Sequence, residues 1–302
     1  MGFSPGATVN LNQLTIKDFD KIFYDTYLRP PTEYTEFLNV NTGNANYKRV
    51  GQVGGFGALV DISEGEAVPY DMVKQGNEKT IRYTNIALAA QVTENMREDD
   101  ITGIIAQIPA MMAKSMLYTC ELKGIDVLNS GFVTTTRAGL DTKSLYSTTH
   151  TLVDSGTAGI NNTTAASLSE TALQALLDTM ENTLNEKGIP IPIQPKLLVI
   201  PVALRWIAER LLLSEKRPGT MDNDVNPLKG MLRFMVSHYT TSNTAYFVVG
   251  DKSDHDLQLI FRRKLKTAAQ DDFNTGSWLY KVSARLTTDF FDWRGTAGNA
   301  GA

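Results

Sequence analysis

The side chains most often used in catalysis are few and widely spaced in this sequence. Its three histidines are His150, His238 and His255, and none lies in an HxxxH or HExxH pattern that would place two metal ligands on one helical face. The single cysteine, Cys120, lies among apolar and helix-forming residues rather than at a helix N-terminus beside a histidine. We therefore expect no zinc site and no cysteine nucleophile, and we interpret each histidine as a surface or core-edge residue.

A glycine-rich run resembles part of a dinucleotide-binding loop. Gly54, Gly55 and Gly57 surround Phe56, but Val60 stands in the place of the last glycine of that fingerprint. No strand-to-helix pattern follows the run, and the sequence contains no GxSxG nucleophile elbow. A flexible β-loop is the better interpretation.

A second motif has the spacing of a calcium loop. Asp222, Asp224 and Asn226 alternate as ligands of such a loop do, but Pro227 replaces the turn glycine and Arg233 stands where the bidentate glutamate belongs. We interpret these residues as a surface loop. The sequence thus predicts no catalytic residue, no metal and no cofactor, and a protein that is not an enzyme.

The charge balance gives no sign of a nucleic-acid-binding domain. Lysine and arginine total 29 against 33 acidic residues, a net charge of −4. The densest basic stretch, Arg262, Arg263, Lys264 and Lys266, is typical of a solvated strand face. One cysteine cannot form a disulfide within the chain, which favours a reducing compartment. Residues 1–12 lack the pattern of a signal peptide, and no apolar stretch is long enough to span a membrane.

The elements that would have to position a site begin with an N-terminal arm. Phe19, Phe23 and Tyr27 recur at the spacing of one helical face, and Pro30 ends the predicted helix. An extended piece is expected over 34–40. With few core residues of its own, such an arm is expected to need another surface to pack against.

Residues 47–91 predict a long two-stranded excursion. The stretch contains six glycines between Gly51 and Gly76, and its return strand alternates from Ile81 to Ala89. An isolated two-stranded ribbon is marginal in water, so we expect this segment to be stabilised against a neighbouring surface.

Helical and strand patterns alternate along the rest of the chain. Acidic residues at 98–100 predict the start of a helix to residue 129 that stops near Gly131. Pro109 is expected either to kink this helix or to mark an irregular first part. After loops with one short strand near Leu145, a capping box at Ser167 starts a helix that stops at Gly188. A strand at 197–200 leads into a helix from Pro201, strands follow at 231–236, 245–249, 257–261 and 279–287, and residues 295–302 form a tail. The fold class is mixed, α+β.

A chain of this size without a site, but with two poorly self-sufficient segments, favours assembly with copies of itself. Five short motifs are distinctive: YTN at 83–85, ENMREDD at 94–100, THTLV at 149–153, LLVIP at 197–201 and TDFFDWRG at 288–295. In these motifs and in the order of its parts, the chain resembles the tailed-phage major capsid proteins with the Hong Kong ninety-seven fold, most closely the Mu-like major head subunits.

The resemblance implies a division of the chain. Residues 1–46 would be the N-terminal arm, 47–82 the extended loop or E-loop, and 83–167 the P domain with a spine helix at about 100–129. Residues 168–265 would be the A domain, and 266–302 would return to the P domain and end in the tail. The residues expected to contact other subunits lie in the arm and the E-loop: Phe19, Phe23, Tyr27, Gly54, Gly55, Phe56, Gly57, Tyr70 and Met72.

The resemblance also implies a function and partners. The chain would assemble into pentamers and hexamers of an icosahedral shell around double-stranded DNA, without sequence-specific DNA contacts, and would be assembled in the bacterial cytoplasm before residing in the virion. Because no long segment precedes the arm, a separate scaffolding protein is expected, with a portal protein and, as an optional partner, a decoration protein. Two alternatives stay open: an encapsulin-like nanocompartment shell and a soluble α/β enzyme.

Overall fold

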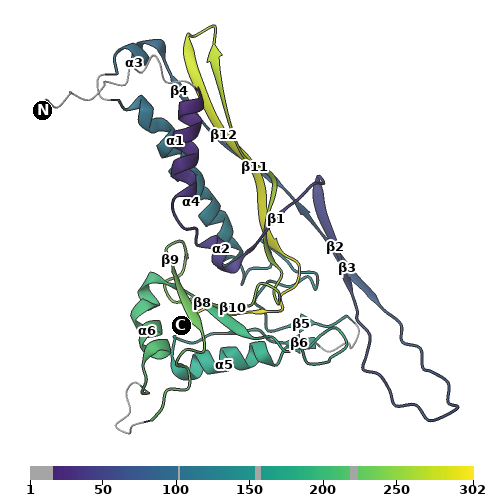
Figure 1. The fold of residues 1–302 in the computed structure, drawn as a ribbon. Helices are drawn as coiled ribbons and strands as arrows, with labels where there is room; N and C mark the ends of the chain where they lie inside the picture. The colour runs from purple at the N-terminus through teal and green to yellow at the C-terminus, as the bar shows by residue number, and fades with distance from the viewer. Residues whose placement is uncertain (1–15, 101–102, 154–157, 218–223) are drawn as a thin grey trace, which may run out of the picture.

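The computed structural model describes residues 16–100, 103–153, 158–217 and 224–302. It has an upper body built on a four-stranded sheet, a lower body built on a five-stranded sheet, and a hairpin that projects from the junction between them (Figure 1). Helices and largely antiparallel strands contribute to both bodies. The α+β prediction is confirmed.

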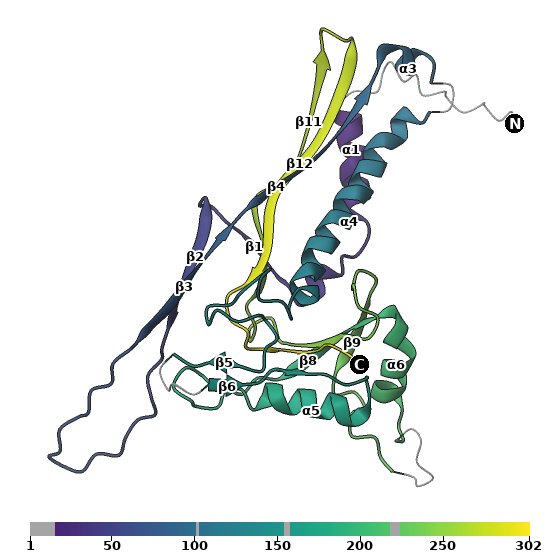
Figure 2. The same ribbon diagram turned by 180° about the vertical axis from the view of Figure 1, so that it is seen from behind.

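The sheet of the upper body has one buried and one open face. Its strand order is β1 (Asn39–Thr42), β11 (Leu257–Asp272), β12 (Ser277–Phe290) and β4 (Thr84–Val92). On β12, Tyr280, Val282 and Leu286 are buried in the core they share with the helices, whereas Lys281 between them is exposed. Figure 2 shows the helices gathered on one side of these strands. Alternation along β12 therefore separates a core face from a solvent face.

The long helix α4 (Ile108–Asn129) lines that core, and it begins later than the sequence predicts. A short helix α3 (Glu94–Glu98), capped by Thr93, and a 3-10 turn (Ile105–Gln107) precede it. The carboxylate of Asp100 accepts hydrogen bonds from the backbone amides of Ile104 and Ile105, so the acidic cluster caps the turn rather than the long helix. Pro109 lies in the first turn of α4, where no intrahelical partner is lost, so of the two predicted outcomes the irregular first part is confirmed and the kink is not.

The N-terminal arm packs against its own subunit. Helix α1 (Ile16–Leu28) lies along α4 (Figure 1), and Phe19 contacts Trp278 with ring centroids 4.6 Å apart. The chain then forms a short helix α2 (Tyr34–Phe37) where an extended piece was predicted. Glu121 of α4 accepts hydrogen bonds from the backbone amides of Glu33 and Tyr34, at 2.8 and 3.0 Å, and fixes α2 to α4.

Two residues of α4 show how closely these helices pack. Gly124 faces Tyr34, and a Cβ at this glycine would lie 2.5 Å from the Cβ of Tyr34. Cys120 is buried as predicted, and burial raises the pKa of its thiol to about 11. The arm therefore packs into the core of its own subunit, and the surface that it was expected to need is supplied for α1 and α2 by α4 and β12.

The lower body has its own sheet and core. The strand order is β7 (Thr163–Thr164), β13 (Thr296–Asn299), β10 (Tyr246–Gly250), β8 (Pro195–Pro201) and β9 (Arg233–Ser237). Helices α5 (Glu170–Glu181) and α6 (Arg205–Leu213), the second preceded by a 3-10 turn (Val202–Leu204), supply the rest of the second core. The predicted strand-then-helix unit at 197–211 is confirmed. The capping residue of α5 is Ser169, whose hydroxyl accepts from the Ala172 amide, and not Ser167.

The chain crosses between the bodies twice near its C-terminus. Strand β11 enters the upper sheet already at Leu257, whereas the predicted A domain extended to residue 265. Strand β13 then returns to the lower sheet between β10 and β7, with all four of its residues buried. The predicted glycine-rich tail at 295–302 is therefore wrong. Gly298 is required there because a Cβ would lie 2.6 Å from the ring of Tyr146.

Candidate assembly surfaces

The projecting hairpin is formed by β2 (Tyr47–Val53) and β3 (Gln75–Arg82), which pair antiparallel as predicted. Residues 54–74 between them, here called the loop tip, contain no strand, and a hydrogen bond of 2.8 Å from the Gly54 amide to the Lys74 carbonyl closes their base. Figures 1 and 2 both show the loop tip extending away from the two bodies. The hairpin and loop tip together span 47–82, the segment that the sequence predicts to be the E-loop.

The loop tip exposes apolar side chains to solvent. Leu59 and Tyr70 are fully exposed at 102% and 98%, Met72 is exposed at 81% and Phe56 at 67%. Transfer of side chains of this size from water to a packed interface is favourable by about 1.5–3 kcal/mol each. These side chains are therefore available to stabilise a contact with another molecule.

The predicted assembly residues divide into two separate groups. In the loop tip, Phe56, Tyr70 and Met72 are exposed together with Gly55 and Gly57, and only Gly54 at its base is buried. On α1, Phe19 and Phe23 are buried at 4% and 0%, and Tyr27 is partly buried against the same core. In a single subunit the rings of Phe19 and Phe23 fill the space between α1, α4 and β12, and their contact with another subunit stays a prediction.

The base of the hairpin is fastened to the junction by polar contacts. Lys79 of β3 forms an ion pair of 2.8 Å with Asp289 and lies 4.4 Å from the centroid of the Phe290 ring. Burial lowers the pKa of Lys79, and the nearby Asp289 carboxylate opposes that shift. The Asn77 amide donates to the Leu140 carbonyl at 3.0 Å. These contacts fix the direction in which the hairpin leaves the molecule.

A second network joins the hairpin to the lower body. Glu186 accepts hydrogen bonds from Gln52 of β2 at 3.0 Å and from the Val153 amide at 2.8 Å, and it forms an ion pair of 2.9 Å with Arg294. Although burial by itself lowers the pKa of Arg294, Asp292 and Glu186 outweigh that effect, and the net pKa is raised. The guanidinium therefore remains charged and holds three segments together.

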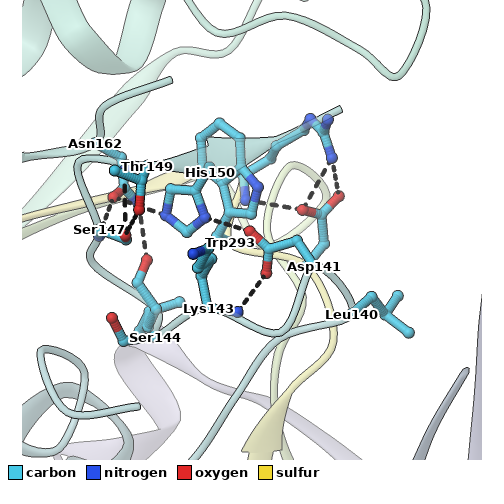
Figure 3. A network of polar contacts seen from close by, with 12 residues as sticks. Leu140, Asp141, Lys143, Ser144, Ser147, Thr149, His150, Asn162 and Trp293 are labelled. Carbon is cyan, nitrogen blue, oxygen red and sulfur yellow. Dashed lines mark hydrogen bonds and ion pairs between the residues drawn. The ribbon is translucent and has the colours of Figure 1, made fainter. Parts of the chain in front are cut away.

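The junction itself is organised around His150, which is fully buried rather than at the surface or core edge (Figure 3). Its Nδ1 lies 2.5 Å from Asp141 Oδ2, its Nε2 lies 3.1 Å from Asn162 Oδ1, and its ring stacks on Trp293 at 4.2 Å. The Asn162 amide donates to the carbonyls of Leu145 and Thr296. An Asp–His pair is common in hydrolases, but this ring faces an amide and reaches no solvent, so its contacts are structural.

The other candidate residues from the sequence do not converge on a site. Asp222 lies outside the described residues, and Asn226 is buried with its amide donating to the carbonyls of Leu211 and Ser214 beside the end of α6. His238 is exposed and contacts Glu33. Within 16–100, 103–153, 158–217 and 224–302, no group of three or more histidine, cysteine or acidic residues is arranged to hold a metal ion. No helix in the described part of the chain has the length and apolar character of a membrane span.

Solved structures from phages and from a virus-like particle have a similar fold. The decorated capsid of bacteriophage JBD30 matches with a TM-score of 0.56 and 17% identity, covering 80% of this chain and 100% of that chain. Microbacterium phage Oxtober96 gives 0.56 and 12%, covering 91% and 93%. A virus-like particle from Pyrococcus furiosus gives 0.54 and 9%, covering 94% and 98%. At these identities the likeness establishes the fold, which is that of the Hong Kong ninety-seven capsid proteins.

Residues 80–299 match the model of a family described as phage capsid protein, over more than two thirds of the chain. The chain therefore belongs to the phage capsid protein family, and its place is the capsid shell of the virion. No curated protein matches the sequence. The predicted capsid fold and capsid function are confirmed, whereas the closer likeness to Mu-like head subunits stays a prediction.

Proposed function

We propose that this capsid protein builds its shell from pentamers and hexamers in which the E-loop of each subunit lies across its neighbour. The lower body would be the A domain around each axis, and the upper body with α4 would be the P domain. The single observation that carries the proposal is the loop tip, which leaves eight large apolar side chains exposed in its own subunit.

The structure of the E-loop suits a contact that must vary between pentamers and hexamers. The base of the hairpin is fixed to the junction by the contacts of Asn77 and Lys79. Beyond the hydrogen bond between Gly54 and Lys74, the loop tip forms no strand. Gly65 adopts a positive φ of 85°, a conformation that residues other than glycine rarely adopt. One sequence can therefore keep the direction of the hairpin while the loop tip follows small changes in the neighbour.

The proposed partners are those of a shell that encloses DNA. We propose a separate scaffolding protein, a portal protein and contact with packaged double-stranded DNA that is not sequence-specific. The JBD30 capsid is decorated with minor capsid protein trimers, which makes a decoration protein a reasonable further partner here. The proposed role is structural, without enzymatic activity. An encapsulin-like shell would contain protein cargo instead of nuclease-protected DNA, and the contents of purified particles distinguish the two.

Shortening the loop tip tests the proposal. We would replace residues 55–73 by a two-residue turn, which the closing hydrogen bond between Gly54 and Lys74 allows without moving β2 or β3. We expect a folded, soluble subunit with an unchanged thermal midpoint that forms no shells under electron microscopy.

A length-preserving variant provides the matched control for that deletion. Leu59→Ser, Tyr70→Ser and Met72→Ser together remove exposed apolar side chains and keep the loop, and we expect the same loss of shells. Ser63→Ala, also in the exposed loop tip, should assemble normally. Normal shells from the shortened variant would contradict the proposal.

A further inference from the structure

The open face of the upper sheet carries a cluster of cations. Residues directly opposite each other in a sheet point to the same face, and here Arg263 of β11 pairs with Arg285 of β12, and Ala268 pairs with Lys281. Lys266 pairs with Ser283, which lies between Arg285 and Lys281 on that face of β12. Four cations therefore share the face opposite the helices, within about 15 Å of one another.

This cationic face has no anionic partner in the described part of the subunit. None of Arg263, Lys266, Lys281 and Arg285 forms an ion pair there, and the Nε of Arg285 is buried without a hydrogen-bond partner. A groove of about 280 Å³ is lined by three of these cations, Arg263, Lys266 and Lys281, together with the small residues Ala87 and Ala268. A face of this kind fits an anionic segment that can enter the groove.

The loop tip has the complementary charge. Between Gly51 and Val73 the sequence contains four carboxylates and no lysine, arginine or histidine. One of the four, Asp71, is held in its own subunit by Lys187 at 2.8 Å. The other three, Asp61, Glu64 and Glu66, are exposed and lie within six residues around the Gly65 turn.

The two surfaces cannot meet within one subunit. Figures 1 and 2 show the loop tip extending from the junction away from the strands β11 and β12, so the occupant of the cationic face must come from another molecule. Nucleic acid is the other polyanion to consider. A single acidic turn fits the groove better, because a duplex would extend past the cluster, where Asp272 follows on the same face of β11.

We propose that the acidic turn of the loop tip, at Asp61, Glu64 and Glu66, docks on the cationic sheet face of a neighbouring copy, at Arg263, Lys266, Lys281 and Arg285. The inference rests on the proposed function, in which the E-loop crosses to another subunit, and it adds the receiving surface and the charges that set its register. The exposed apolar side chains of the loop tip would supply buried contact area, and the opposite charges would select where the loop tip binds on the neighbouring subunit.

Reciprocal charge reversal tests this docking. One variant carries Asp61→Lys, Glu64→Lys and Glu66→Lys, a second carries Arg263→Glu, Lys266→Glu and Lys281→Glu, and a third combines all six changes. We expect each single-sided variant to lower the shell yield at least about tenfold, since several opposed pairs become repulsive at every contact. The combined variant should recover most of the yield, and circular dichroism checks that each subunit is folded.

A control reverses Asp178 and Glu181, two exposed acids on α5, and should leave the yield unchanged. Single-sided variants that assemble like the parent, or folded combined variants that stay without shells, would overturn the docking and leave the proposed function standing. A cationic-face variant that forms shells but loses packaged DNA would overturn it in favour of nucleic acid. A parent chain that forms no shells at all would contradict the proposed function itself.

Cysteine pairing gives a second readout that does not depend on yield. Glu64→Cys combined with Lys281→Cys should form disulfides between copies in assembled shells, visible as a ladder on a non-reducing gel. Glu64→Cys combined with Asp178→Cys should give no ladder. Equal ladders from both pairs, or none from either in intact shells, would contradict the proposed register.

Discussion

The burial of Phe23 between α1 and α4 leads to a quantitative prediction about the arm. Its side chain is 0% exposed in a single subunit, and its ring lies 6.2 Å from that of Tyr27 on the same helix. Truncation of a buried phenylalanine to alanine costs about 3–5 kcal/mol, from lost transfer energy and from the cavity left behind. Because a domain is stable by only about 5–15 kcal/mol, Phe23→Ala should strongly destabilise the subunit even before assembly.

Urea unfolding of the unassembled subunit, monitored by circular dichroism, measures this effect. The protein concentration is kept below that at which shells assemble. Leu28→Ala on the same helix is the matched control. Leu28 is 74% exposed, and its truncation should change the free energy of unfolding by less than about 0.5 kcal/mol. If Phe23→Ala were as mild as the control in the unassembled subunit, α1 would be held by another subunit and the intramolecular packing would be refuted.

Three further predictions concern the core and the junction. Burial lowers the pKa of His255 to about 4, so as the pH falls the unfolded chain takes up a proton at this histidine near pH 6.5, before the folded chain does. The free energy of unfolding should therefore fall by about 3 kcal/mol between pH 6.5 and pH 4. In urea titrations, His255→Gln should flatten that pH dependence. Gly124→Val should lower the thermal midpoint because its side chain overlaps Tyr34, whereas Gly55→Ala, which meets nothing within 4 Å, should not. Asn162→Ala should cost about 2–4 kcal/mol in urea unfolding, because it leaves buried hydrogen-bonding groups unpaired; a cost below 1 kcal/mol would contradict the structural role of this network.

The sequence was most informative where a pattern is local. The buried face of α5, the strand-then-helix unit of β8 and α6, and the paired strands of the E-loop all follow from spacing within a few residues. The exposure of Phe56, Tyr70 and Met72 agrees with a segment that has too few contacts to form a core of its own. Their role between subunits is the part that stays a proposal.

Predictions failed where distant residues decide the structure. The apolar face of α1 was recognised from its spacing, but spacing does not say whether α4 of the same chain or another subunit covers it. Strand β13 was mistaken for a tail because its sequence contains glycine. Gly298 is needed there to leave room for the ring of Tyr146, a residue far earlier in the chain. His150 is buried because Asp141, Asn162 and Trp293 meet around it, and no local signal links these four positions.

The cationic face was missed for a related reason. Arg263 and Lys266 were recognised as a solvated strand face, but Lys281 and Arg285 joined them only through the pairing of β11 with β12, whose register shifts twice between Phe261 and Lys266. Alternation along β12 alone, from Tyr280 to Leu286, would have indicated an open face with two cations.

Electron microscopy of the purified protein, co-expressed with its neighbouring genes so that any scaffolding protein is present, tests the central claim most directly. We predict closed icosahedral shells, with rings of five and six subunits resolved in their surface and the loop tip of each subunit lying over the next. A population of uniform monomers that persists at high concentration with the scaffolding protein present would contradict the account.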